Sequence, residues 1–149
     1  MLSYKHGYHA GNQADVLKHI CLIQAYKSLK RHHNSISYID TNAGSGDYNF
    51  KSDYMSKNKE YENGISKLEN YKYENQSIKF YLKVLRNINN SKKLTFYPGS
   101  PSIISHLSDS NDKLLFYELH NNEVQLLRKH LAKQINSKVY NMDGFEFFL

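Results

Sequence analysis

Hydrophobic and polar positions change their period several times along the chain, and these changes predict its elements. From about residue 14 to 31, apolar side chains recur every three or four positions, which predicts an amphipathic helix. Asn12 is a suitable N-cap for it, and Asp15 falls in the first turn, where a carboxylate is favourable. Residues 35–39 are rich in β-branched and aromatic side chains and predict a short buried strand that ends at Asp40.

Residues 50–95 are rich in Lys, Asn and Tyr and are patterned more weakly. One amphipathic helix is predicted around 77–88 and a weaker one over 59–70. A chain of 149 residues is the size of one domain and can bury a real core. We therefore interpret 1–149 as part of a single domain and 50–95 as a helical insertion within it, between the first and second strands.

The last third of the chain returns to clear helix and strand signals. Ser100 followed by Pro101 predicts a helix start, with the serine hydroxyl as the cap. Strands are predicted at 114–118 and 138–141, and the asparagine pair at 121–122 can cap the helix between them. A last helix is expected to begin directly after the third strand.

Helices and strands thus alternate, which predicts an α/β fold with a partial parallel sheet of three strands, covered by helices on both faces. Ligands of such sheets bind beyond the carboxyl ends of the strands. Each predicted strand is followed there by an acid, Asp40, Glu118 or Asp143, and Gly44 and Gly46 come soon after the first. The sequence therefore predicts a pocket at this edge of the sheet.

The composition and charge of the chain indicate a second kind of partner, a polyanion. The formal net charge is +6, and the excess of cations lies in residues 1–100. A basic surface favours a polyanion such as RNA or DNA, and a merely solvated lysine-rich surface is the alternative. The single Cys21 fits a reducing compartment, and no apolar run is long enough for a membrane span. We expect a cytoplasmic protein without membrane contact.

The three acids and the glycine pair suit an adenosine-containing cofactor. A carboxylate such as Glu118 can accept hydrogen bonds from both ribose hydroxyls. Asp143 could accept from an adenine amino group or could simply cap the helix that follows it. The glycine pair alone is as consistent with an ordinary turn.

NAD and S-adenosylmethionine both remain open as the cofactor. No G-x-G-x-x-G series exists, because Asn49 stands where the third glycine would be, and no G-K-[ST] follows. S-adenosylmethionine has no pyrophosphate and does not need that third glycine. Its sulfonium and ammonium groups also suit the charge of Asp40, so the turn favours it, and an NAD-dependent oxidoreductase is the distant alternative.

Five segments together resemble one family: MLSYKHGYHAGNQADVLKH, YIDTNAGSGDY, YPGSP, YELH and MDGF. They resemble the RlmJ family, bacterial methyltransferases that modify an adenine N6 in 23S ribosomal RNA. The resemblance covers essentially the whole chain, and H-A-G-N-x-A-D-V-x-K-H is its most specific part. It implies a Rossmann-like class I methyltransferase fold, S-adenosylmethionine as the methyl donor and 23S ribosomal RNA as the substrate.

The resemblance also implies site residues. The cofactor contacts that it implies fall on Lys18, His19, Asn42, Ser100, Glu118, Asp143 and Gly144. The glycine turn adds Asp40, Gly44 and Gly46 to this set. Position 42 is usually histidine in the family, and Asn42 can still donate and accept hydrogen bonds but loses the ring contact. Tyr4 and His6 are expected to meet the RNA, and no metal site is expected from the histidine spacings.

Enzymes of this class usually carry a D/N-P-P-F/Y/W segment after the fourth strand, which orients the adenine amino group and stacks on the base. This chain has only two prolines, Pro98 and Pro101, and no such segment. It therefore resembles the N-terminal half of an enzyme, with catalytic residues expected beyond Leu149. We expect the chain alone to be inactive and able to self-associate through the open edge of its first strand. The alternative is a non-catalytic module that binds the cofactor or RNA.

Overall fold

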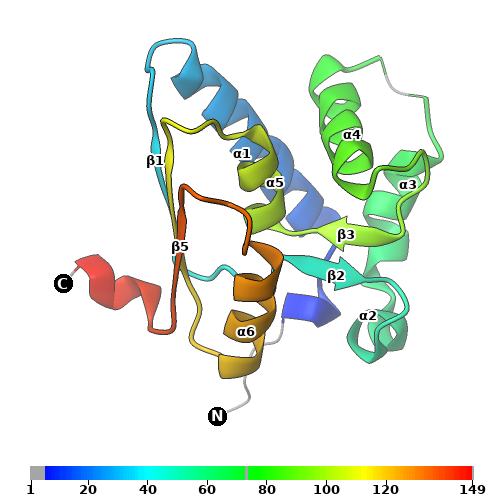
Figure 1. The fold of residues 1–149 in the computed structure, drawn as a ribbon. Coiled ribbons are helices and arrows are strands. Elements are labelled where there is room, and N and C mark those ends of the chain that lie inside the picture. The colour runs from blue at the N-terminus through cyan, green and yellow to red at the C-terminus, as the bar shows by residue number, and fades with distance from the viewer. Residues whose placement is uncertain (1–5, 73, 149) are drawn as a thin grey trace.

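The computed structural model describes residues 6–72 and 74–148. Three strands form a parallel sheet in the order β1-β4-β5, as Figure 1 shows nearly edge-on. Their bounds are β1 (Ser37–Asp40), β4 (Lys113–Tyr117) and β5 (Ser137–Tyr140). The predicted partial parallel sheet is confirmed, and β1 lies at one of its edges.

The register of the sheet brings the three carboxyl ends together. Asp40 of β1 lies opposite Phe116 of β4, and Tyr117 lies opposite Tyr140 of β5. Because all three strands run in the same direction, the segments that follow them leave the sheet at one edge. The acids after the strands are therefore neighbours in space although they are far apart in the sequence.

Three helices pack on one face of this sheet: α1 (Gln13–Lys30), α5 (Ser100–Leu107) and α6 (Asn121–His130). Only the short 3-10 helix η3 (Gly144–Phe148) lies on the other side among the described residues (Figure 1). The expectation of helices on both faces was therefore wrong for this part of the chain. Both crossovers step across the sheet in the same direction, and right-handed crossovers of that kind place their helices on the same face.

The core on this face is built around the central strand. Leu114 and Phe116 of β4 are fully buried and pack against one apolar side chain from each helix: Tyr26, Ile104 and Leu127. The central position of β4 explains why it is the most buried strand. All three helices thus pack against the strands whose carboxyl ends carry the acids.

A short antiparallel pair was not predicted. It joins β2 (Asp47–Asn49) to β3 (Phe96–Pro98), with Tyr48 opposite Tyr97. Each strand has three residues, which is too short for a periodic signal. The pair brings the two ends of segment 50–95 together beside the glycine turn.

Four helices lie within segment 50–95: α2 (Asp53–Asn58), the 3-10 helix η2 (Glu60–Asn63), α3 (Ile65–Glu69) and α4 (Gln76–Asn89). The helix predicted at 77–88 is confirmed as α4, whose Tyr81 and Leu85 are fully buried in a second core cluster shared with α1. The weaker helix predicted over 59–70 divides at Gly64, where a Cβ would lie 2.0 Å from the carbonyl oxygen of Gly11. The close approach of the two backbones therefore requires glycine at position 64.

The helix caps confirm one expectation and correct two. The Asn12 side chain accepts a hydrogen bond of 2.9 Å from the Asp15 amide, as expected for an N-cap. The cap of α5 is Gly99 rather than Ser100, which is already helical and directs its hydroxyl to Asp40. The cap position of α6 is His120, one residue before the asparagine pair.

Candidate functional site

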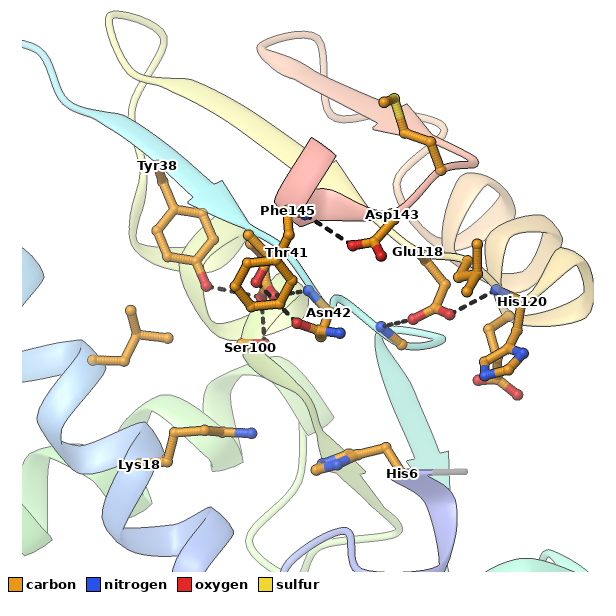
Figure 2. A pocket seen from close by; sticks show the side chains of 16 residues that line it. His6, Lys18, Tyr38, Thr41, Asn42, Ser100, Glu118, His120, Asp143 and Phe145 are labelled. Atoms are coloured by element: carbon orange, nitrogen blue, oxygen red, sulfur yellow. Dashed lines mark hydrogen bonds between the residues drawn. The ribbon is translucent and has the colours of Figure 1, made fainter. Parts of the chain in front are cut away.

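A cavity of about 600 Å³ opens at the carboxyl edge of the sheet (Figure 2). We call it the strand-end cavity. Eight of the residues singled out in the sequence line it: His6, Lys18, Asp40, Asn42, Gly44, Ser100, Glu118 and Asp143. They come from η1 (His6–Tyr8), α1, α5 and the segments that end or follow β1, β4 and β5. The structure thus brings the acids of all three strand ends to one cavity.

Glu118 connects two segments of the cavity wall. One carboxylate oxygen, Oε2, accepts a hydrogen bond of 2.8 Å from the Gly44 amide, and Oε1 accepts one of 2.8 Å from the His120 amide. The residue is only 7% exposed. Because a carboxylate has about four acceptor positions, each oxygen can still accept a bond from a ligand hydroxyl. Glu118 is therefore both held by the backbone and open to a ligand.

Asp40 connects β1 to α5. Its Oδ2 accepts hydrogen bonds from the Ser100 hydroxyl at 2.7 Å and the Tyr38 hydroxyl at 2.9 Å. Its Oδ1 accepts a hydrogen bond of 3.2 Å from the backbone amide of Asn42. Burial, followed by the charge of Asp40 and its hydrogen bond, raises the pKa of Tyr38 well above its ordinary value, so the phenol stays a donor. Asp40 thus fixes the position of Ser100 on the cavity wall.

The turn after β1 requires glycine at position 44. Gly44 has a φ of +66°, a conformation that other residues rarely adopt, and an added Cβ would lie 2.1 Å from the Tyr48 hydroxyl oxygen. The Ala43 amide donates a hydrogen bond of 2.9 Å to the carbonyl oxygen of Tyr117, which ties the turn to the central strand. The turn therefore forms a wall of the cavity whose position is fixed by these contacts.

A part-buried polar cluster holds the far end of the same turn. The Gly46 carbonyl oxygen accepts hydrogen bonds from the Gly99 amide at 2.7 Å and the Ser102 hydroxyl at 2.9 Å. The Ser102 hydroxyl lies 2.8 Å from Nε2 of His130, whose Nδ1 lies 3.0 Å from Oδ2 of Asp47. Burial raises the pKa of Asp47, and Ser102 and His130 oppose that rise. Because Ser102 is 4% exposed and does not line the strand-end cavity, this serine–histidine–aspartate cluster positions the turn rather than a nucleophile.

The segment after β5 forms the opposite wall. Oδ1 of Asp143 accepts a hydrogen bond of 2.9 Å from the Phe145 amide, so Asp143 caps η3 and lines the cavity at the same time. Gly144 does not line the cavity. A Cβ there would lie 2.4 Å from the Cα of Thr41, so glycine is what allows η3 to pack on the end of β1. Gly46 likewise does not line the cavity.

A charged cluster lies at the side of the cavity formed by α1. Asp15 is 4% exposed and pairs with Lys18 and, at 3.1 Å, with Nε2 of His6. Burial opposes its ionisation, but the hydrogen bond with His6 and the electrostatic effects of the neighbouring His19, His6 and Lys18 side chains hold the pKa of Asp15 well below its ordinary value. The Lys18 side chain extends toward the cavity, as Figure 2 shows.

The structure does not bring His19 into the cavity. Its ring is fully buried, and Nδ1 lies 2.8 Å from the Tyr97 hydroxyl oxygen. Burial lowers the pKa of His19 to about 3, against the opposing effect of Asp15. Contact of His19 with a cofactor therefore stays a prediction, as does contact of Tyr4 with RNA, because Tyr4 lies outside the described residues.

Sequence reasoning missed half of the cavity wall. The further lining residues are Leu22, Tyr38, Thr41, Leu119, His120, Glu123, Met142 and Phe145. Most of them lie within a few positions of a strand end, which was the available signal. Leu119, Met142 and Phe145 form an apolar part of the wall, and no polar group marks them in the sequence as ligand contacts.

The cavity is acidic in a basic chain. Its wall carries four carboxylates, from Asp40, Glu118, Glu123 and Asp143, and one lysine, Lys18. This arrangement favours a ligand with positive charge and disfavours an anionic pyrophosphate. Among residues 6–72 and 74–148, no group of three or more His, Cys, Asp or Glu side chains has an arrangement that could hold a metal ion.

Comparison with known proteins decides the family. The model of the family described as Ribosomal RNA large subunit methyltransferase D, RlmJ, matches residues 33–148. The chain belongs to the RlmJ family. Two relatives, from Escherichia coli K12 and Haemophilus influenzae, are both named Ribosomal RNA large subunit methyltransferase J. Each is 38% identical to this chain, and each alignment covers 98% of this chain and 52% of the relative.

A solved structure shows the same fold. The crystal structure of a Legionella pneumophila protein matches with a TM-score of 0.80 and 34% identity, over 93% of this chain and 51% of that one. Together with the family, this likeness confirms a Rossmann-like fold. The chain spans about half the length of the RlmJ relatives that it matches. No helix within the described ranges has the length and apolar character needed to cross a membrane.

Proposed function

We propose that this chain is the cofactor-binding, N-terminal part of an enzyme that transfers a methyl group from S-adenosylmethionine to N6 of an adenine in 23S ribosomal RNA. The observation that carries the proposal is the acidic strand-end cavity, where three strand ends and a glycine turn meet. The names of the relatives support ribosomal RNA methylation as the reaction. In this proposal, residues 50–95 are an insertion within one methyltransferase domain.

The residues present fit S-adenosylmethionine better than a dinucleotide. Four carboxylates against one lysine suit a ligand with a sulfonium and an ammonium group. Glu118 keeps acceptor capacity for two ribose hydroxyls, and Asp143 can accept from the adenine amino group. Leu119 and Met142 supply apolar surface for the adenine ring. When bound, the cofactor supplies an electrophilic methyl group.

The chain's own residues bind and orient rather than catalyse. The bonds of Glu118 to Gly44 and His120 fix the side chain that would hold the ribose. The bond of Ser100 to Asp40 fixes the wall on the α5 side. His6 and Lys18 line the side formed by η1 and α1, where we place the approach of the RNA. Asn42 is exposed at the rim, and its side-chain oxygen accepts from the Thr41 hydroxyl at 2.9 Å.

These 149 residues contain no D/N-P-P-Y segment, so no residue in them is assigned the task of orienting the adenine amino group. We therefore expect the chain alone to bind cofactor without transferring a methyl group. The same absence supports the second candidate, a non-catalytic module that binds cofactor or RNA. Extending the chain separates the two, because only an enzyme regains transfer when a segment of that kind is present.

Two further expectations follow from the fold. In the described sheet, β1 pairs only with β4, so its other edge is open and we propose that it supports self-association. Sedimentation of the chain at rising concentration tests this, and a constant monomer mass would contradict it. We also propose that the protein is cytoplasmic, because an enzyme of ribosomal RNA works where ribosomes assemble.

Methyl transfer tests the function directly. The full-length gene product, given labelled S-adenosylmethionine and unmodified 23S RNA, is expected to label N6 of an adenine, and the 149-residue chain alongside is expected to give background only. Glu118→Gln in the full-length protein should lose most transfer, whereas the exposed Glu62→Gln should keep it. Label on another base, or none with folded full-length protein, would contradict the proposal.

A further inference from the structure

A second cavity, of about 570 Å³, lies within segment 50–95. Its lining residues belong to α4 and to residues 71, 72 and 74, which precede that helix. Its lining residues are Tyr71, Lys72, Glu74, Lys79, Leu82 and Arg86. We call it the insert groove. It shares no residue with the strand-end cavity and has the opposite charge.

The insert groove lies in the most basic part of the chain. Residues 50–95 contain ten Lys and Arg against five Asp and Glu, an excess of five out of the whole chain's six. Lys79, Lys83 and Arg86 are spaced four and three residues apart, which places them on one side of α4. Within the described ranges, no carboxylate forms an ion pair with Lys72, Lys79 or Arg86. Because Glu74 is the one acid among the lining residues, the groove keeps an excess of two positive charges.

Arg86 carries the more specific signal. Its Nε is buried and finds no hydrogen-bond acceptor among the described residues. A buried charged donor without an acceptor is costly, and an anion close to the guanidinium group offsets part of that cost. The planar guanidinium group can present two parallel N–H donors to a phosphate, a geometry that lysine cannot offer. Arg86 thus lacks a protein acceptor at Nε and lines a groove in which an anion can lie beside its guanidinium group.

An aromatic side chain stands beside these cations. Tyr71 is 68% exposed and lines the groove, and Leu82 adds an apolar floor between the charged groups. Phosphate-binding cations next to exposed aromatic rings are the arrangement by which single-stranded nucleic acids are bound, because the backbone meets the cations while a base stacks on the ring. A merely solvated surface needs neither the groove nor the aromatic ring.

We propose that the insert groove binds a short single-stranded stretch of the RNA substrate. Arg86, Lys79 and Lys72 each contact a phosphate of this stretch, and Tyr71 stacks on one of its bases. The inference rests on the proposed function in taking RNA as the partner. It adds a second contact for the RNA outside the strand-end cavity.

The fold connects the two cavities. Segment 50–95 is joined to the rest of the chain by the β2–β3 pair, and β2 begins at Asp47, directly after the glycine turn. The groove is therefore held by the same turn that forms one wall of the strand-end cavity.

Fluorescence anisotropy with a labelled single-stranded RNA of about ten nucleotides tests the groove, titrated with the 149-residue chain from 50 to 200 mM NaCl. The double variant Lys79→Gln/Arg86→Gln should flatten the slope of log affinity against log salt by about 1.4, because each lost phosphate contact removes about 0.7. The matched control Lys113→Gln/Lys129→Gln removes two exposed cations outside the segment and should leave the slope unchanged.

Three single variants separate charge, geometry and stacking. Arg86→Lys keeps the charge but loses the paired N–H donors, so it should weaken binding while largely keeping the slope. Tyr71→Leu should weaken binding about 5-fold or more with no change of slope. Glu74→Gln removes the one acid of the groove and should tighten binding, a gain that misfolding cannot produce. Circular dichroism verifies that each variant is folded.

The outcomes distinguish the groove from the proposed function. Loss of RNA affinity in the groove variants, with S-adenosylhomocysteine binding unchanged, supports the inference, and this loss would stand even if the cofactor pocket failed its own test. Equal affinity and slope in Lys79→Gln/Arg86→Gln and in the control pair would overturn it, while leaving the strand-end cavity untouched. Equal or tighter binding of a polyglutamate peptide would also overturn it, because the groove would then recognise charge alone.

Discussion

The strand-end cavity and the insert groove are nearly opposite in charge although they belong to one small chain. The cavity wall has four carboxylates and one lysine, whereas the groove has two lysines, one arginine and one glutamate. A formal charge of +6 describes neither of them. The difference teaches that local charge, set by which elements meet, determines what each part of the molecule can bind. A chain-wide excess of cations conceals an acidic pocket.

The two regions also differ in how they are built. The cavity joins groups that are far apart in the sequence, such as Gly44 and Glu118, through the parallel sheet and direct hydrogen bonds. The groove joins α4 to the chain directly before it. The cavity therefore depends on the whole tertiary structure, whereas the groove depends mainly on local packing. Changes in the sheet should affect the cavity first.

The largest effect is expected from Glu118→Gln. The substitution removes the charge that holds the Gly44 and His120 amides and that would accept the ribose hydroxyls. The two charge-assisted bonds to the ribose hydroxyls are worth about 1.5 kcal/mol each. Their loss should weaken S-adenosylhomocysteine binding about 100-fold or more, as measured by calorimetry. RNA affinity should not change. Equal loss in Glu62→Gln would show that the effect is not specific to the cavity.

The next largest effect is expected from Gly44→Ala. The φ of +66° and a Cβ placed 2.1 Å from the Tyr48 hydroxyl oxygen should lower the free energy of unfolding by about 2 kcal/mol or more, measured in urea. Adding Tyr48→Phe removes the clashing oxygen and should recover part of that loss. An unchanged free energy of unfolding in Gly44→Ala would mean that the turn is not the rigid wall described here.

The sheet and its acidic edge could be predicted from the sequence because their signals are local. A run of β-branched and aromatic residues indicated β1, and Asp40 followed directly from the end of that run. The β2–β3 pair could not be predicted, because its two short strands are identified only by the packing of Tyr48 and Tyr97. The face taken by the helices depends on the direction of both crossovers and not on any residue pattern.

The site was predicted in its polar half only. Glu118 and Asp143 were recognisable as acids after strands, but the apolar wall of Leu119 and Met142 has no distinctive chemistry in the sequence. The burial of His19 was equally hidden, since α1 carries apolar residues on several sides. The unsatisfied Nε of Arg86 exists only in the folded molecule. Burial and pairing are tertiary properties, and they decided these cases.

The next largest effect is expected in the salt dependence of binding, which should differ between the insert groove and the strand-end cavity. Three phosphate contacts in the insert groove give a slope of about −2, so RNA affinity should fall about 20-fold between 50 and 200 mM NaCl. Binding of S-adenosylhomocysteine, whose contacts lie in a partly buried cavity, should change by about 2-fold or less. Parallel titrations by anisotropy and calorimetry test this. A similar salt dependence for both ligands would remove the distinction between the regions.

The smallest effect concerns the buried His19. Burial lowers the pKa of His19 to about 3, so below its ordinary value near 6.5 the unfolded chain takes up a proton that the folded chain does not. The contribution of His19 to the free energy of unfolding is therefore full above pH 6.5. It falls by about 1.4 kcal/mol per pH unit as the pH decreases from there toward 3. Asp15, whose pKa is lowered, adds a loss only below about 3.8.

Urea unfolding at pH 6.0 and 4.5 isolates His19, because Asp15 stays ionised over this range. His19→Gln should lose less stability across the interval than the unmodified chain, by about 1.4 kcal/mol per pH unit. A parallel fall in both proteins would show that His19 is not held neutral in the folded chain.

Calorimetric titration of the 149-residue chain with S-adenosylhomocysteine and, separately, with NAD tests the central claim most directly. An acidic cavity at the strand ends predicts that S-adenosylhomocysteine binds one site per chain, at least about 10-fold more tightly than NAD, whose pyrophosphate meets four carboxylates. Tighter binding of NAD, or no binding of S-adenosylhomocysteine to chain that circular dichroism shows to be folded, would contradict it.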